Sequence, residues 1–161
     1  MSLFRASILI IILAVASVLT AQPEGEYQWQ NVEPMDQARS GHASVVYDGE
    51  IYVFGGQNSR RQTLRSLEIY NPHNDSWRAG PRMPRPLSYH TAVVAGDHIF
   101  IFGGSSDPGR PEVGIIRFSP DEGDDRPYHR VRDMSEPRYN TNAVVVNNGT
   151  ILVMGGISNH V

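Results

Sequence analysis

The sequence predicts an all-β protein built from repeated units of four antiparallel strands. Three observations support this fold class. One pattern of residues recurs three times along the chain. Its apolar runs are too short for helices and are rich in Val, Ile, Phe and Tyr, as strands are. Turn-forming residues separate these runs, which is the arrangement expected for β-hairpins.

The recurring segment opens on a methionine and closes on two glycines. Residues 35–56 read MDQARSGHASVVYDGEIYVFGG, residues 83–104 read MPRPLSYHTAVVAGDHIFIFGG, and residues 134–156 read MSEPRYNTNAVVVNNGTILVMGG. The first and second methionines are 48 residues apart, and the second and third are 51 apart. A fixed period of this size is typical of proteins whose structural units stack on one another.

Each copy is predicted to begin with a β-hairpin. In the first copy, the apolar residues 45–47 and 51–54 flank Asp48 and Gly49. In the third copy, Asn148 and Gly149 stand at the turn. A type I′ turn needs positive φ at both central residues, which makes Asp-Gly and Asn-Gly strong hairpin signals.

Two further strands are expected after the glycine pair. In the first copy, residues 66–70 form a third apolar run, residues 71–75 form a turn, and the last strand contains Trp77. In the second copy Tyr128 takes the place of Trp77, because each lies six residues before the next methionine. The three additional residues of the second period fall in the acidic loop before Tyr128, where added length costs little.

These features resemble the kelch repeat, in which a glycine pair ends the second strand and an aromatic residue and a tryptophan follow. Tyr70 and Trp77, seven residues apart, match this pattern, whereas Phe118 and Tyr128 depart from it with a spacing of ten. The resemblance covers residues 29–156 and implies a partial β-propeller of about 2.5 four-stranded blades. It also implies that the following residues are structural: Gly55, Gly56, Tyr70, Trp77, Gly103, Gly104, Phe118, Tyr128, Gly155 and Gly156.

The domain organisation expected from the repeats has five parts. Residues 1–21 form a signal peptide, and residues 22–34 form the fourth strand, around Trp29, of an incomplete blade. Residues 35–83 and 84–134 are complete repeats, and residues 135–161 are a repeat cut after its second strand. A propeller closes with four to eight blades, so we expect either a truncated form of a larger propeller or self-association through exposed blade faces.

The N-terminus has the pattern of a secretory signal. Arg5 precedes an apolar stretch at residues 8–18, and Ala21 is a small residue suited to cleavage. The alternative is an uncleaved membrane anchor, which needs roughly 20 apolar residues. We therefore expect a secreted or periplasmic protein, with contact to a membrane only if the segment is retained.

Charge and composition exclude several functions. The formal net charge is −3, and no basic stripe suited to nucleic acid is present. The chain has no cysteine, which excludes a cysteine nucleophile, a thiolate metal site and the tyrosine–cysteine cofactor of copper oxidases related to kelch propellers. No phosphate-binding loop, metal-ligand spacing or nucleophile with a base is evident, so we expect no cofactor and no catalytic residues.

The candidate binding residues are arginines and histidines of the predicted loops. Arg39 and Arg138, with a cluster at Arg60, Arg61 and Arg65, can bind carboxylates of a partner or of an acidic sugar.

His42 and His90 occupy the same repeat position, which Thr141 takes in the third copy. The two histidines can reach a common ligand near one end of the propeller. Alternatively, each can cap its strand through a hydrogen bond to the backbone.

Two other features have a functional and a simpler interpretation. The acidic loop at residues 121–125 can hold a hard cation or can be a solvated hairpin tip. Asn74 and Asn148 begin Asn-X-Ser/Thr triplets in predicted turns, which are N-glycosylation acceptors if the protein is eukaryotic.

Taken with the resemblance, these features predict a non-catalytic binding module that presents blade loops to a protein or glycan partner. The alternative is part of a carbohydrate enzyme similar to the exported bacterial kelch mutarotases that act on sialic acid, in which arginines would grip the substrate carboxylate. Fold alone does not decide between binding and catalysis.

Overall fold

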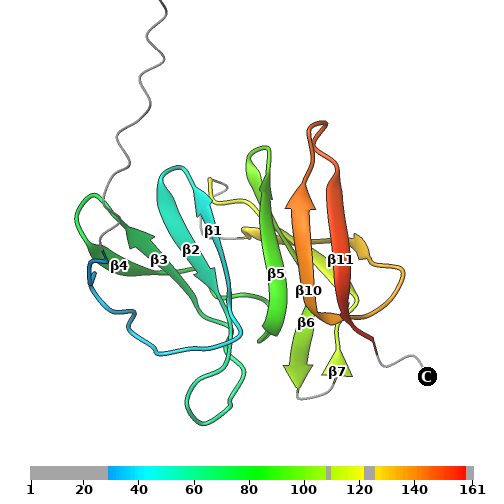
Figure 1. The fold of residues 1–161 in the computed structure, drawn as a ribbon, viewed down its shortest axis with the longest axis horizontal. Coiled ribbons are helices and arrows are strands. Elements are labelled where there is room, and N and C mark those ends of the chain that lie inside the picture. The colour runs from blue at the N-terminus through cyan, green and yellow to red at the C-terminus, as the bar shows by residue number, and fades with distance from the viewer. Residues whose placement is uncertain (1–28, 108–109, 122–125, 159–161) are drawn as a thin grey trace, which may run out of the picture. The chain divides into compact units, whose positions relative to one another are not determined.

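The computed structural model describes residues 29–107, 110–121 and 126–158, and within them it contains eleven strands and no helix (Figure 1). This confirms the predicted all-β fold of repeated antiparallel sheets. The predicted signal segment, residues 1–21, lies outside the described residues. In the part of the chain that is described, no helix has the length and apolarity needed to cross a bilayer.

The first sheet has the predicted four strands in the order of the sequence. They are β1 (Ala43–Tyr47), β2 (Glu50–Phe54), β3 (Leu67–Asn71) and β4 (Ser76–Gly80). The β1–β2 turn is the predicted two-residue hairpin, because Tyr47 pairs with Glu50 and both Asp48 and Gly49 have positive φ, at 47° and 75°. These dihedrals are those of a type I′ turn.

The second sheet repeats this order and adds one short strand. It contains β5 (Ser88–Ala95), β6 (His98–Asp107), β8 (Gly114–Phe118) and β9 (Tyr128–Asp133), with β7 (Arg110–Pro111) paired to β6. The third sheet contains β10 (Tyr139–Val145) and β11 (Ile151–Ile157).

The turn between β10 and β11 differs from the sequence-based expectation. Five residues separate the two strands, and of these only Gly149 has positive φ, at 77°. The Gly149 N–H donates to the Val146 carbonyl, and the Thr150 N–H donates to Asn148 Oδ1. The turn is therefore longer than type I′. The backbone of Asn148 does not adopt positive φ, and its side chain instead bonds the backbone locally.

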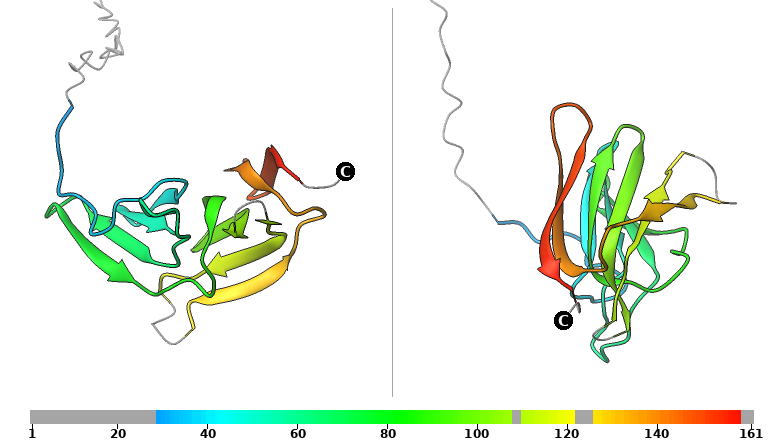
Figure 2. Two further views of the ribbon diagram at one scale, coloured as in Figure 1. Left: turned by 90° about the horizontal axis from the view of Figure 1, so that it is seen from below. Right: turned by 90° about the vertical axis from the view of Figure 1, so that its right-hand side faces the viewer.

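The sheets follow one another side by side (Figure 2), and the core consists of side chains from neighbouring sheets. Apolar side chains of the first and second sheets form one continuous cluster, and a smaller cluster joins the second sheet to the third. Phe54, Met83, Ile99 and Ile101 in the larger cluster are completely inaccessible to solvent. Each sheet is thus stabilised mainly by its neighbours, as in repeat proteins.

The glycine pairs make the closest contacts between sheets. Gly55 and Gly56 have φ of 56° and 93°, which glycine adopts at little cost. A Cβ added to Gly55 would overlap the Leu87 carbonyl oxygen, and the Gly56 N–H donates to that same oxygen at 2.8 Å. Gly103 and Gly104 make the same contacts with Arg138 of the next repeat, including an N–H···O bond of 2.9 Å.

Aromatic residues of the last two strands pair in both complete repeats. The rings of Tyr70 and Trp77 lie 5.0 Å apart, and those of Phe118 and Tyr128 lie 4.7 Å apart. Trp77 Nε1 donates to the carbonyl oxygen of Glu33, two residues before the methionine of its repeat. Tyr128 has the equivalent bond to Pro81, described below, so the two aromatic residues are structural equivalents despite the longer loop.

The expected fourth strand around Trp29 is not formed in the described part of its segment. Residues 29–34 have no strand structure, and the rest of residues 22–34 lies outside the described residues. An isolated strand would leave its N–H and C=O groups without a neighbouring strand to bond, which explains why the aromatic residue at position 29 is not sufficient to form one.

Candidate functional site

The three sheets bring equivalent residues together where their first strands begin. Strand β5 lies between β1 and β10 (Figure 1). Gly41, Tyr89 and Asn140 occupy the same repeat position at or just before the first residues of these strands, and all three have positive φ, at 61°, 56° and 52°. This conformation is unusual for a bulky residue such as Tyr89, and backbone strain of this kind concentrates at functional sites.

A hollow of about 320 Å³ lies over these strand starts, and His42 and His90 are both among its lining residues. The other lining residues are Gly41, Tyr89, Asn140, Thr141 and Asn142. His42 is exposed, whereas His90 has only 6% of its surface accessible. Thr141 is oriented by a hydrogen bond of 2.9 Å to the Met154 carbonyl.

The two ring nitrogens of His90 are buried without a hydrogen bond of good geometry, although the Phe54 backbone carbonyl lies near enough to act on the ring as an acceptor. Burial, followed by the charge of His42, lowers the pKa of His90 to about 4, and the nearby Phe54 carbonyl opposes this shift only in part. The pKa of His42 is also lowered, first by burial and then by the charge of Arg39. His90 is therefore neutral at physiological pH and packs against Gly55.

A second hollow of about 390 Å³ adjoins the first and shares Tyr89 with it. Its other lining residues are Ser40, Gln57, Asn58, Arg61, Ser105 and Tyr139. We call the two hollows together the strand-start surface. The Tyr89 hydroxyl donates to Gln57 Oε1 at 3.3 Å, and the rings of Tyr89 and Tyr139 lie 6.4 Å apart. Hydroxyl, amide, guanidinium and aromatic groups from three sheets therefore converge here.

The two predicted binding arginines at the strand starts have structural contacts instead. The side chain of Arg39 is fully buried, forms an ion pair with Glu68, and donates from Nη1 to the Gly55 carbonyl at 2.8 Å. Arg138 makes the equivalent bond of 2.8 Å to the Gly155 carbonyl and pairs with Glu136 at 3.1 Å. Each arginine bonds the carbonyl of the first glycine in the glycine pair of its own repeat. The side chains of both are therefore engaged within the protein, whereas the sequence suggested that they would face a ligand.

Tyr89, Tyr139 and Gln57 line the site but were not among the predicted residues. Gln57 and Ser105 each follow a glycine pair directly, and Ser40 and Tyr139 occupy one repeat position. The repeat register therefore contained a usable signal, because several residues just after the glycines and near the start of the first strand reach the same surface.

Comparison with known proteins decides the family. A model of the KLHDC2/KLHL20/DRC7 Kelch-repeats domain matches residues 18–161. The chain belongs to the kelch-repeat family. The sheets described above are accordingly kelch blades, each of four strands where complete.

Several curated kelch proteins are similar to parts of the chain. Kelch-like protein 33 of Homo sapiens is 39% identical over 72 residues, which are 45% of this chain and 13% of the relative. Kelch-like protein 15 of Homo sapiens is 35% identical over 100 residues, which are 58% of this chain and 17% of the relative. Beta-scruin of Limulus polyphemus is 37% identical over 60 residues, covering 37% and 7%. The chain spans less than a fifth of each.

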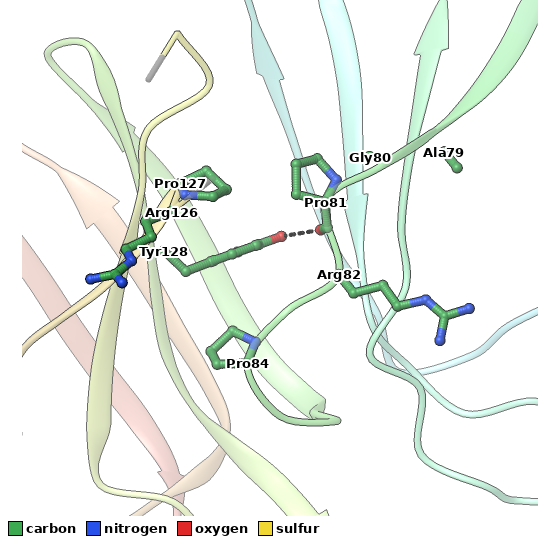
Figure 3. Close-up of a pocket in the computed structure, with 8 residues that line it drawn as sticks. All are labelled: Ala79, Gly80, Pro81, Arg82, Pro84, Arg126, Pro127 and Tyr128. Atoms are coloured by element: carbon green, nitrogen blue, oxygen red, sulfur yellow. Dashed lines mark hydrogen bonds between the residues drawn. The ribbon is translucent and has the colours of Figure 1, made fainter. Parts of the chain in front are cut away.

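A further hollow of this kelch chain lies between the end of β4 and the start of β9 (Figure 3). It has a volume of about 510 Å³ and is lined by Ala79, Gly80, Pro81, Arg82, Pro84, Arg126, Pro127 and Tyr128. The Tyr128 hydroxyl crosses it and donates to the Pro81 carbonyl at 2.7 Å. We call it the β4–β9 groove.

The remaining predicted residues are distributed over other loops. Asn74 and Asn148 are exposed at the β3–β4 and β10–β11 turns. Arg65 donates from Nε to the Met83 carbonyl at 2.9 Å and is structural, whereas Arg61 lines the strand-start surface.

The predicted cation loop falls mainly outside the described residues, which omit 122–125. Its first residue, Asp121, accepts a hydrogen bond of 2.9 Å from Tyr47. Among the residues that are described, no three His, Cys, Asp or Glu side chains are grouped as metal ligands would be.

Proposed function

We propose that this chain is a protein-interaction module that binds an extended segment of a partner on its strand-start surface. One observation supports this most strongly: loops of three successive kelch blades contribute polar side chains to adjoining hollows of about 390 and 320 Å³. Loops held by a rigid β-scaffold are the usual location of binding residues.

The chemistry of the surface suits a peptide. Arg61 is exposed, and its guanidinium makes no hydrogen bond or ion pair with the residues described, so it is free to take a carboxylate. Asn58 can bond peptide groups. Tyr89 and Tyr139 add apolar area with little loss of side-chain entropy, and tyrosine and arginine are the residues that contribute most at protein interfaces.

Selection from a peptide library tests this function and does not require a named partner. A displayed library of random peptides is selected on the wild-type chain and then measured against the double variant Arg61→Ala/Tyr139→Ala. Peptides that depend on the surface should lose at least about ten-fold in affinity, which is about 1.4 kcal/mol. Arg110→Ala, a change of an exposed arginine in β7 outside this surface, serves as the matched control.

Three outcomes are distinguishable in this selection. Loss of affinity in the double variant alone supports the proposal. Equal binding by wild type and double variant places the peptides elsewhere and overturns it. Failure to select peptides, together with binding on a glycan array that the same double variant abolishes, favours the alternative of a carbohydrate-binding surface and also overturns it.

We further propose that the protein is exported. Arg5, the apolar residues 8–18 and Ala21 support this. Expression with a C-terminal tag, followed by N-terminal sequencing of the secreted product, tests it. Cleavage near Ala21 is expected, and a product that remains intracellular with an intact N-terminus contradicts export.

A further inference from the structure

The β4–β9 groove, with a volume of about 510 Å³, is not used by the proposed function. It lies between the fourth strands of two kelch blades (Figure 3) and shares no lining residue with the strand-start surface. We propose that this groove is a second binding site, for an extended acidic segment of a protein partner.

The floor of the groove is apolar and is fixed in place. Pro81, Pro84 and Pro127 surround the ring of Tyr128, and proline has little conformational freedom to lose on binding. Burial raises the pKa of Tyr128, so its hydroxyl remains protonated and keeps its bond to Pro81 over the physiological range. The groove is therefore preformed, which lowers the entropic cost of binding.

The rim of the groove is positively charged. Arg82 and Arg126 are both exposed on the lining, and neither makes a hydrogen bond or ion pair with the residues described. No carboxylate lines the groove in that part of the chain. Two guanidinium groups that no described residue pairs, beside an apolar floor, favour a ligand that carries carboxylates, because arginine binds them with two parallel N–H···O bonds.

A smaller hollow of about 260 Å³ extends the groove along β9. It shares Pro84 and Tyr128 with the groove and also contains Arg85, Ile116, His129 and Arg130. The groove is therefore longer than a pocket for one side chain.

Strand β9 ends the order of its sheet, and among the described strands it is paired only with β8. Its free edge can accept the backbone of an extended peptide, as in other cases where a strand is added to a sheet edge. An extended ligand thus fits both the length of the groove and its edge.

The first repeat shows that the kelch fold does not require these arginines and prolines. Glu33, Asp36 and Asp75 occupy the positions of Pro81, Pro84 and Arg126. Asp75 accepts bonds from the Glu33 N–H at 2.8 Å and from the Tyr70 hydroxyl at 2.7 Å, so the first repeat uses its own groups there. The same place is acidic in one repeat and basic in the next, which is expected if the second serves binding.

Fluorescence anisotropy with a defined probe tests the site. The probe is a fluorescein-labelled nonapeptide of alternating glutamate and valine, compared with the same peptide made with glutamine. We expect the full chain to bind the glutamate peptide and the double variant Arg82→Ala/Arg126→Ala to raise its Kd about ten-fold, since two exposed ion pairs are lost. Both side chains are exposed, and urea unfolding confirms that the variant is folded.

Two controls make the result specific. Arg110→Ala removes one positive charge at an exposed position outside the groove and should change Kd by less than about two-fold, because salt screens charges beyond the Debye length. Arg61→Ala should likewise leave Kd unchanged, since it belongs to the strand-start surface. An equal effect of Arg110→Ala, equal binding of the glutamine peptide, dependence on Arg61, or no binding at all would each overturn the proposal.

Discussion

Arg39 and Glu68 form an ion pair in which the side chains are 0% and 6% exposed, and this pair ties the segment before β1 to the third strand of the same blade. Glu68 also accepts a bond of 3.0 Å from the Asp36 N–H, and Arg39 donates to the Gly55 carbonyl at 2.8 Å. The ion pair therefore fixes the position of the segment that leads into the strand-start surface. It also fixes Gly55, the first residue of the glycine pair.

Arg39→Ala should lower the free energy of unfolding by roughly 3 to 5 kcal/mol, because it leaves the Glu68 carboxylate buried without a partner. Urea unfolding followed by circular dichroism measures this. The matched control is Arg78→Ala, which breaks an ion pair with Glu50 whose side chains are 53% and 20% exposed. An exposed pair of this kind contributes about 1 kcal/mol or less.

The buried ion pair explains the loss of stability only if the effects of changing Arg39 and Glu68 are not additive. The double variant Arg39→Met/Glu68→Leu removes both charges and should regain much of the lost stability. If the double variant is as unstable as the sum of the single changes, or if Arg39→Ala costs no more than Arg78→Ala, the ion pair is not what holds this segment.

Gly103→Ala and Gly155→Ala separate the backbone role of the glycines from their packing role. Both have positive φ, at 61° and 65°, so each substitution should cost about 1 to 2 kcal/mol for the conformation alone. A Cβ on Gly103 would also overlap the Arg138 carbonyl oxygen, whereas a Cβ on Gly155 would meet no described atom within 4 Å.

The Gly103 substitution should therefore be the worse of the two by about 2 kcal/mol, the usual range for overpacking. Equal losses in thermal or urea unfolding would mean that the contact between blades is not the reason for a glycine here.

His90 should make the protein less stable as the pH falls. Its pKa is about 4 in the folded chain and 6.5 when unfolded, so below pH 6.5 the unfolded chain binds more protons. The free energy of unfolding should fall from pH 6.5 down to about 4, and by about 2 kcal/mol between pH 7 and pH 5. Urea unfolding at these two pH values measures the loss.

Two histidine variants test whether the buried His90 ring causes this loss of stability between pH 7 and pH 5. His90→Gln should remove most of the difference between the two pH values, whereas His73→Gln, at the exposed β3–β4 turn, should preserve it. A pH dependence unchanged by His90→Gln would show that other groups cause it.

The repeat pattern predicted the architecture well because it reports local structure. Asp48 and Gly49 form the predicted type I′ turn. Tyr128 occupies the repeat position of Trp77, and the two residues make equivalent bonds to Pro81 and Glu33. The strand expected at Trp29 is absent from residues 29–34, because strand formation depends on a neighbouring strand that no local pattern reveals.

The site residues were harder to predict because charge alone does not show what a side chain contacts. Arg39 and Arg61 both look like loop arginines in the sequence, yet the first is buried against Glu68 and the second is exposed on the strand-start surface. His42 and His90 both line one hollow, but the burial of His90 depends on packing against Gly55 of the preceding blade.

The hydrogen bonds of the glycine pairs also affect how repeats can be added to such a protein by gene duplication. Within one repeat, the Leu87 carbonyl accepts from Gly56 of the repeat before it, and the Gly104 N–H donates to Arg138 of the repeat after it. The complete repeat at residues 84–134 thus encodes both an acceptor for its predecessor and a donor for its successor. A tandem duplication of one unit would arrive already matched to its neighbours on both sides.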